Sequence, residues 1–159
     1  MNDTTDTTMT ANDAEVRITR VFDASRVRVF RAWTDPDDVA MWFSPAPLTT
    51  PRESVRIDLR VGGRYELTMV MPDGTASPLG FEIIELDPPG LLVLRSDPMP
   101  EAGMPKPTLV RIELHEEAST QGVRTRMTLR DGPYPSGFGV HAERGWLSAF
   151  DKLVAVVAG

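Results

Sequence analysis

The sequence contains no cysteine among its 159 residues, which excludes disulfide bonds, thiolate metal ligands and a cysteine nucleophile. It also lacks a basic stripe, because its 17 Lys and Arg residues are scattered and outnumbered by 23 Asp and Glu residues. Nucleic acid is therefore not an expected partner, since phosphate backbones are bound by clustered positive charge. No apolar run approaches the roughly 20 residues that span a bilayer, and the N-terminus has no signal-peptide pattern. We expect a cytoplasmic protein without membrane insertion.

The composition favours a single folded domain preceded by a short tail. Hydrophobic residues make up 41% and charged residues 25% of the chain, both ordinary for a globular protein, and the length suits one domain. Residues 1–13 are rich in Thr, Asp and Asn, with Met1 and Met9 as the only large apolar side chains. Such a segment buries too little surface to offset its ordering entropy. We therefore expect a disordered tail over 1–13 and one domain over 14–159.

Two short helices are predicted after a first strand at 15–22. Ser25 can cap a helix that runs through about Trp33, because a serine oxygen accepts from the free backbone N–H groups of a first turn. Asp35 and Pro36 then start a second helix, with the aspartate as N-cap and the proline at the first helical position. This second helix is expected to end near Phe43, before a proline-rich loop.

Alternating apolar and polar residues predict a meander of six further strands. One face of these strands is apolar and the other solvated, which is typical of an antiparallel sheet. Gly62 and Gly63 mark one of the tight turns. The six predicted strands lie at about 55–59, 65–71, 79–86, 91–95, 110–115 and 123–130.

The last segment is predicted to be a long helix from about Phe138 to Val157. Its apolar stripe is formed by Trp146, Phe150, Leu153, Val154 and Val157, which repeat at helical spacing. A sheet with one apolar face needs a cover, and this helix can supply it. The predicted class is α+β with a helix-grip fold, in which a curved antiparallel sheet of six to seven strands wraps the C-terminal helix.

Several segments resemble the START-like superfamily, and within it the family similar to the C-terminal domain of the activator of the Hsp90 ATPase. The resemblance covers about residues 15–157. It is carried by segment 20–36 (RVFDASRVRVFRAWTDP), segment 58–65 (DLRVGGRY), and by Trp42, Asp73, Gly74, Gly80, Gly145, Trp146 and Leu153.

The resemblance implies a cup that holds an apolar or amphipathic small molecule between sheet and helix, without chemistry. Some relatives in the wider superfamily are aromatases or cyclases, so the resemblance also implies a cyclase- or hydrolase-like enzyme as an alternative, although no catalytic residue can be assigned. A third alternative is a co-chaperone-type protein that acts on an Hsp90-like ATPase in a stress response. The sequence leaves open whether the protein is a monomer or a homodimer.

Large side chains are predicted to point into the space between sheet and final helix and to contact the ligand. The alternative for each is ordinary core packing, which is the commoner role of apolar sheet positions. Tyr65 could supply a polar group inside a cavity. The candidate ligand-binding residues are Trp33, Trp42, Phe43, Tyr65, Met69, Met71, Phe81, Met127, Phe138, His141, Trp146 and Phe150.

Chemistry would need polar groups that converge inside the cup. The candidates for such a role are Tyr65, His141, Glu82 and Glu85, and the faces of the strand that holds the two glutamates are not decided by its pattern. His115 is expected on the solvated face, with no second histidine spaced to complete a metal site. Gly62 and Gly63 lack the pattern of a phosphate loop. We expect no metal and no cofactor.

Overall fold

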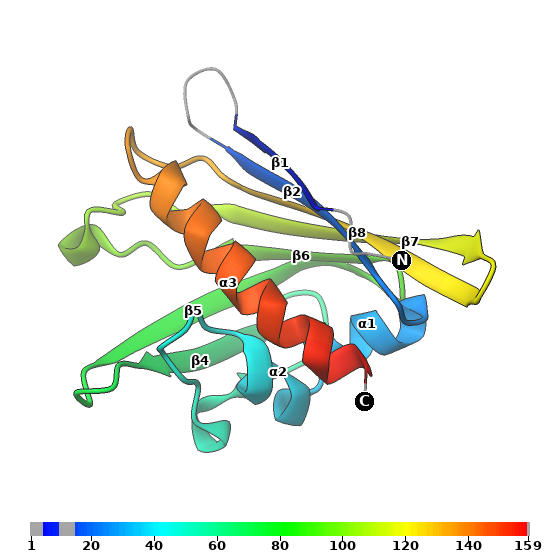
Figure 1. The fold of residues 1–159 in the computed structure, drawn as a ribbon. Helices are drawn as coiled ribbons and strands as arrows, with labels where there is room; N and C mark the ends of the chain where they lie inside the picture. Colours follow the sequence, from blue (N-terminus) through cyan, green and yellow to red (C-terminus); the bar gives the residue numbers. More distant parts are fainter. Residues whose placement is uncertain (1–4, 10–14, 159) are drawn as a thin grey trace.

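The protein folds into a curved antiparallel sheet whose concave face is covered by a long C-terminal helix (Figure 1). The structure is a computed structural model that describes residues 5–9 and 15–158. The strands follow the order β1-β2-β8-β7-β6-β5-β4-β3 across the sheet. The predicted α+β class and helix-grip arrangement are confirmed. The strands are β1 (Thr5–Met9), β2 (Val16–Phe22), β3 (Arg56–Ile57), β4 (Arg64–Val70), β5 (Ala76–Asp87), β6 (Leu91–Ser96), β7 (Leu109–Ser119) and β8 (Gly122–Gly132).

All seven predicted strands are present, and β1 is an eighth that was not predicted. It pairs with β2 in antiparallel register, from Thr5 opposite Arg20 to Met9 opposite Val16. The prediction of a disordered tail is therefore wrong for residues 5–9, while the other residues of that tail lie outside the described part. Threonine has a high strand propensity, and the open edge of β2 offers backbone partners to an added strand.

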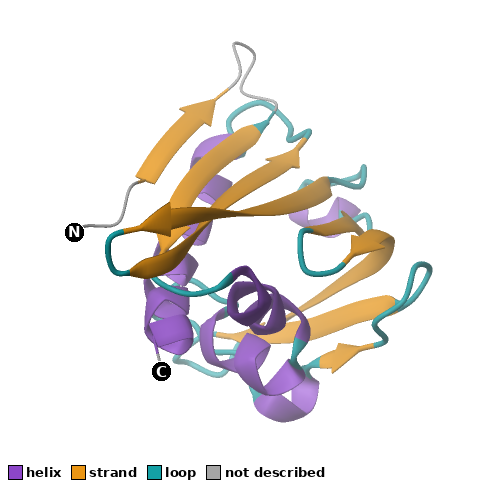
Figure 2. Ribbon diagram, turned by 90° about the vertical axis from the view of Figure 1, so that its right-hand side faces the viewer, coloured by secondary structure: helices purple, strands orange, loops and turns teal. Residues whose placement is uncertain are grey.

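Two short helices, α1 (Arg26–Thr34) and α2 (Pro36–Trp42), begin at the predicted caps. The Ser25 hydroxyl accepts from the Arg28 backbone N–H at 3.2 Å, and the Asp35 carboxylate accepts from the Asp37 N–H at 2.8 Å. The C-terminal helix, α3 (Gly139–Ala158), matches its predicted span within one residue at each end. Figure 2 shows all three helices on the inner side of the curved sheet.

The last carbonyl groups of α1 are bonded by core side chains. The Trp42 indole N–H donates to the Ala32 carbonyl at 2.8 Å, and the Tyr65 hydroxyl donates to the Trp33 carbonyl at 2.6 Å. Carbonyls at the end of a helix have no partner within it, so these two contacts satisfy them where water is excluded. They also fix α1 to α2 and to β4.

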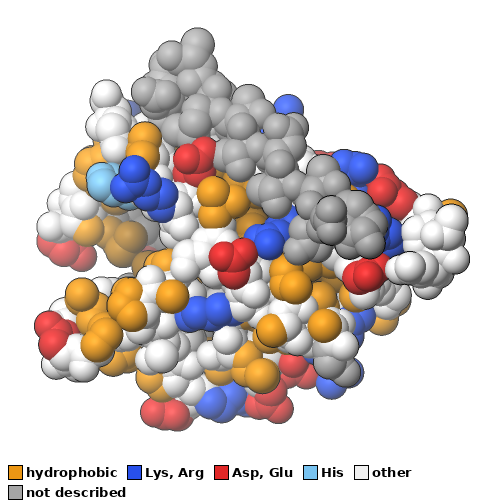
Figure 3. Space-filling view, in the orientation of Figure 1, with side chains coloured by type: hydrophobic (Ala, Val, Ile, Leu, Met, Phe, Trp, Pro, Cys, Tyr) orange, Lys and Arg blue, Asp and Glu red, His pale blue; other side chains and the backbone are white. Residues whose placement is uncertain are grey.

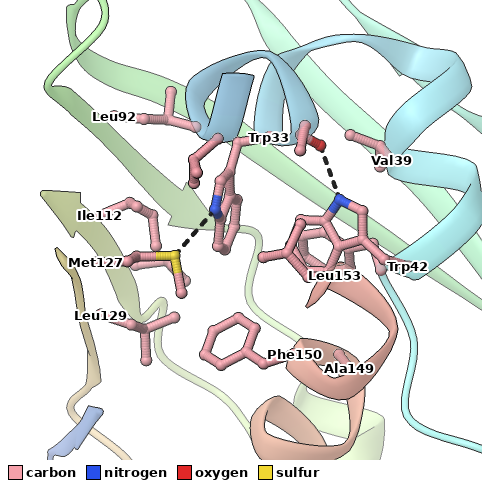
Figure 4. Packing of buried hydrophobic residues seen from close by; sticks show 14 of the residues in the cluster. Trp33, Val39, Trp42, Leu92, Ile112, Met127, Leu129, Ala149, Phe150 and Leu153 are labelled. Carbon is pink, nitrogen blue, oxygen red and sulfur yellow. Dashed lines mark hydrogen bonds between the residues drawn. The ribbon is translucent and has the colours of Figure 1, made fainter. Parts of the chain in front are cut away.

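The core lies under the C-terminal half of α3, where α1 and α2 pack beside the helix (Figure 4). Trp33, Trp42 and Phe150 are fully buried and contact one another at ring-centroid distances of 4.6–6.3 Å. The Trp33 indole N–H points at the Met127 sulfur, 3.3 Å away. Strands β7 and β8 supply the floor of this core, with Ile112 directly opposite Leu129. None of the described helices is long and apolar enough to cross a membrane.

Candidate ligand-binding cavity

A cavity of about 350 Å³ lies between the first turns of α3 and the concave face of the sheet. Its walls come from β4, β5, β7, the end of β8, α3, and the loops around 43–45 and 97–108. This volume falls within the range of roughly 300–1,000 Å³ found for small-molecule sites, and it exceeds the space that one water needs. Figure 3 shows the surface hollowed on the side where α3 begins.

Most of the cavity wall is apolar. Aromatic rings form part of it, and those of Phe43 and Trp146 pack edge to face with their centroids 5.4 Å apart. Three methionines are part of the lining, and such flexible side chains adapt to irregular shapes. The apolar lining consists of Phe43, Pro45, Met69, Leu79, Phe81, Met99, Met104, Val110, Phe138, Ala142, Trp146 and Ala149.

The loop 97–108 closes one side of the cavity. Met99 and Met104 form an isolated β-bridge within it, and the Phe138 ring packs directly on Gly103. A Cβ at Gly103 would lie 2.9 Å from the Phe138 ring, and the backbone φ there is +81°, so both the close contact and the left-handed conformation favour glycine. This contact joins the loop to the start of α3.

Polar groups gather at the end of the cavity formed by β6, β7 and β8. Asp131 lies near the end of β8, on the concave face of the sheet, and is only 1% exposed. Its Oδ2 atom accepts from the Trp146 indole N–H at 2.7 Å and from the Tyr134 hydroxyl. Ser96 and Thr108 stand next to it, with their hydroxyl oxygens 3.1 Å apart. One end of the cavity is thus polar and the rest apolar.

Burial raises the pKa of Asp131 from 3.8 to about 6. Desolvation disfavours the charged carboxylate, and the hydrogen bonds from Tyr134 and Trp146, together with the nearby Thr108 hydroxyl, limit the rise. Burial also raises the pKa of Tyr134, so its hydroxyl stays protonated and donates. Asp131 is therefore a buried carboxyl whose pKa lies above the usual range of an aspartate.

Six of the twelve predicted ligand-binding residues line this cavity, and six do not. Those in the wall are Phe43, Met69, Phe81, Phe138, His141 and Trp146. His141 is exposed and stands where the cavity opens, on the first turn of α3. Trp33, Trp42, Tyr65, Met127 and Phe150 are each 0% exposed and belong to the packed core, where neighbouring rings and strands fill the space around them.

The inward orientation predicted for Met71 is wrong. Its side chain is 43% exposed because it lies just beyond β4, at the β4–β5 turn. Tyr65 is not a free polar group, since its hydroxyl is bonded to the Trp33 carbonyl. Glu82 and Glu85 face outward and pair with arginines, Glu82 with Arg95 at 2.6 Å. Of the four candidates for a catalytic role, His141 is therefore the one that lines the cavity with a free polar group.

Asp131 and Tyr134 were missed by the sequence analysis. The alternation of β8 puts Thr125, Met127 and Leu129 on the concave face, and two residues further on it puts Asp131 there too. An acid at the end of an apolar row was the available signal. The partners of Asp131 could not be predicted from sequence spacing, because Trp146 comes from α3 and Thr108 from the loop that precedes β7.

Histidine and acidic residues do not gather into a metal site among the described residues. His115 is 64% exposed on β7, and its Nε2 atom lies 3.5 Å from the Glu113 carboxylate. This contact is on the convex face of the sheet, away from the cavity. His115 therefore takes no part in the candidate site.

The model of one protein family, described as "Activator of Hsp90 ATPase homolog 1-like protein", matches residues 23–158. Among curated proteins, none matches this chain. The family match covers all three helices and every strand of the sheet except β1 and β2. It includes every residue of the cavity wall.

Solved structures from several bacteria share the fold. A protein from Chromobacterium violaceum has a TM-score of 0.76 at 22% identity, over 91% of this chain and 98% of that one. A protein from Arthrobacter aurescens has a TM-score of 0.77 at 23% identity, over 96% and 91%. The AHSA1 protein of Silicibacter pomeroyi has a TM-score of 0.68 at 20% identity, over 91% and 98%. At such identities the likeness concerns the fold alone.

Proposed function

This chain belongs to the family of Activator of Hsp90 ATPase homolog 1-like proteins, and we propose that its role is to bind a small amphipathic molecule in the cavity beside α3. The observation that carries the proposal is the cavity of about 350 Å³, apolar over most of its wall and polar at one end. Burial of an apolar ligand surface there is favourable by about 25 cal/mol per Å². A polar group on the ligand would find several partners gathered at the Asp131 end.

The shape of the wall supports binding more than packing. Val110 from the sheet and Ala142 and Ala149 from α3 leave space between the two layers, whereas two tryptophans occupy the corresponding space under the C-terminal half of the helix. The Met99–Met104 loop is part of the cavity wall outside the packed core, and its described contacts include the Met99–Met104 bridge and the packing of Phe138 on Gly103. A ligand could therefore enter without disturbing the core.

A direct test uses N-phenylnaphthylamine, a neutral apolar probe whose fluorescence rises when it leaves water. The matched variants are Gly145→Leu and Gly145→Ala on α3. Gly145 lines the cavity, and a Cβ added there meets only Pro45, at 3.9 Å. Leucine would fill the cavity, whereas alanine adds one methyl group. Both replace a helical glycine and are expected to keep or raise helix stability.

The wild type and Gly145→Ala are expected to bind the probe, and Gly145→Leu to lose at least about tenfold in affinity, which is 1.4 kcal/mol. Equal binding by all three would place the probe elsewhere and overturn the proposal, as would an absence of binding by the wild type. Native mass spectrometry of the purified protein gives an independent readout through any small molecule that copurifies.

A chaperone partner is the other implication of the family and remains a prediction. A pull-down with an Hsp90-type ATPase tests it. The Gly145→Leu variant separates the two roles, because it changes the cavity and leaves the convex face of the sheet unaltered. Loss of probe binding without loss of capture would show that the two activities are independent.

A further inference from the structure

The cavity carries negative charge without a matching cation in its wall. Its charged lining residues are Asp97 and Asp131, and the described lining contains neither lysine nor arginine. The Asp97 carboxylate is bound by the Arg64 guanidinium, which reaches it from the convex side of the sheet. Asp131 has no such partner: among the described residues no cation forms an ion pair with it.

Asp131 differs in this respect from aspartates that are paired with arginine. Asp38, for example, is 14% exposed at its side chain and binds Arg28 at 2.8 Å. Asp131 is more deeply buried, at 1% exposure, and has only neutral donors around it. A buried carboxylate without a cation is costly, and positions that keep such a charge are often functional.

The hydrogen bonds that Asp131 accepts from Tyr134 and Trp146 both go to one of its two oxygens. Oδ2 is occupied by the Tyr134 hydroxyl and the Trp146 indole N–H, which fix the plane of the carboxylate. Oδ1 is buried and has no hydrogen-bond partner within the described part of the chain, although the nearby Thr108 hydroxyl favours its charged form. An ionised carboxylate has room for several donors.

The groups around this end of the cavity suit a positive charge. The Trp146 ring lines the cavity and bonds Asp131 through its indole N–H, and aromatic faces attract cations. An anionic amphiphile such as a fatty acid would instead bring its carboxylate next to that of Asp131. In a site of low dielectric the two negative charges would repel strongly.

We propose that the cavity selects an amphipathic ligand with a cationic nitrogen, such as a primary ammonium, which lies at the end formed by Asp131, Thr108 and Tyr134. The apolar body of the ligand lies against Met69, Phe81 and Phe138, and anionic amphiphiles are excluded. This inference rests on the proposed function and adds the chemical class of the ligand.

The test compares three probes with the same naphthalene body: naphthylmethylamine, naphthylmethanol and naphthoate. Isothermal titration calorimetry measures their affinities at about pH 8, where Asp131, with its pKa of about 6, is ionised and an ordinary histidine is neutral. The amine is expected to bind about tenfold or more tighter than the alcohol, since a charge-assisted hydrogen bond is stronger than a neutral one. The naphthoate is expected to bind most weakly.

Asp131→Asn keeps the shape of the side chain and removes its charge. This variant is expected to lose the preference for the amine and to bind the alcohol as the wild type does. Glu82→Gln is the matched control, because it removes a carboxylate from the convex face, where Glu82 is paired with Arg95. It is expected to keep the wild-type order of the three probes.

The outcomes separate this inference from the function on which it rests. If naphthoate binds as tightly as the amine, the charge selection is wrong, while ligand binding stands. If the preference for the amine survives in Asp131→Asn, the assignment to Asp131 is wrong. If none of the probes binds the wild type, both the proposed function and this inference fail. Because the probe order is measured first on the wild type, a poorly folded variant cannot decide the result.

Discussion

The two halves of α3 cover the same sheet and differ in what lies beneath them. Under the C-terminal half, Trp33, Trp42, Phe150 and Leu153 are 0% exposed and fill the space. Under the N-terminal half, about 350 Å³ stays open beside Trp146. The difference comes from α1 and α2, which pack beside the C-terminal half and reach the N-terminal half at Trp146, whose ring centroid lies 5.9 Å from that of Trp33. An apolar helical stripe therefore becomes core or cavity wall according to its neighbours.

The polar groups follow the same division. In the packed half, the Tyr65 hydroxyl and the Trp42 indole N–H each bond a carbonyl at the end of α1. In the open half, the Trp146 indole N–H and the Tyr134 hydroxyl both bond one buried carboxylate. The first set completes a helix end, whereas the second set holds a charge. We therefore expect substitutions in the two halves to have different signatures.

The largest effect is expected for Phe150→Ala compared with Phe138→Ala. Phe150 is fully buried among three aromatic rings, so its removal leaves a cavity in the core and costs about 3–5 kcal/mol of unfolding free energy. Phe138 borders space that is already open, and we expect a loss of about 1 kcal/mol. Urea denaturation measures both. Equal losses would mean that the two halves are packed alike.

The next largest effect concerns the pH dependence of stability at Asp131. Its pKa of about 6 lies above the ordinary 3.8, so the folded state favours the protonated form. The stabilisation is complete below about pH 4 and is lost as pH rises through about 6. Relative to Asp131→Asn, the wild type should lose roughly 3 kcal/mol between about pH 4 and pH 8.

Parallel denaturation curves of the two proteins across this pH range provide the measurement. Subtracting the variant removes the contribution of the other carboxylates, several of which are paired with arginine. Among the described residues Asp131 is the one fully buried acid, so Phe150→Ala serves as a control whose deficit should not change with pH. A flat difference between wild type and Asp131→Asn would contradict the burial of a charge at this position.

Smaller effects are expected from removing one hydroxyl in each half. Tyr65→Phe leaves the Trp33 carbonyl without its partner and should cost about 1–2 kcal/mol at every pH. Tyr134→Phe removes a donor from Asp131, so its cost should grow above about pH 6, where the carboxylate is charged. Thermal unfolding at two pH values distinguishes them. The same pH profile for both variants would show that Tyr134 does not hold the charge.

The smallest effect is expected for Gly145→Ala. Alanine raises helix propensity by about 1 kcal/mol relative to glycine, and the added methyl group meets only Pro45 at 3.9 Å. A modest rise in the melting temperature is the expected result. A fall would mean that the first turns of α3 lie closer to the 43–45 loop than the open cavity allows.

Local signals predicted the fold well because each depends on a few neighbouring residues. Ser25 and Asp35 cap their helices as expected, and the stripe from Trp146 to Val157 faces the sheet. β1 was missed because Thr5–Met9 form a strand only when the edge of β2 is present to pair with them. Composition alone does not contain that partner.

The candidate site was less predictable because it depends on which elements come together. Alternation places Tyr65 and Met69 on one face of β4, yet Tyr65 is core and Met69 is cavity wall, since α1 reaches only the first. The cluster at Asp131 joins residues from β8, α3 and a loop. No sequence spacing records those contacts, although the acid at the end of an apolar row was visible.

The most direct test of the contrast between the two halves is heteronuclear NMR of the three tryptophan side chains during titration with naphthylmethylamine. Each indole N–H gives one signal, assigned with single Trp→Phe variants. The Trp146 N–H, bonded to Asp131 in the cavity wall, is expected to shift with saturation. The Trp42 N–H, bonded to the Ala32 carbonyl in the core, is expected to stay in place. A shift of Trp42 as large as that of Trp146, or no shift of Trp146, would contradict the account.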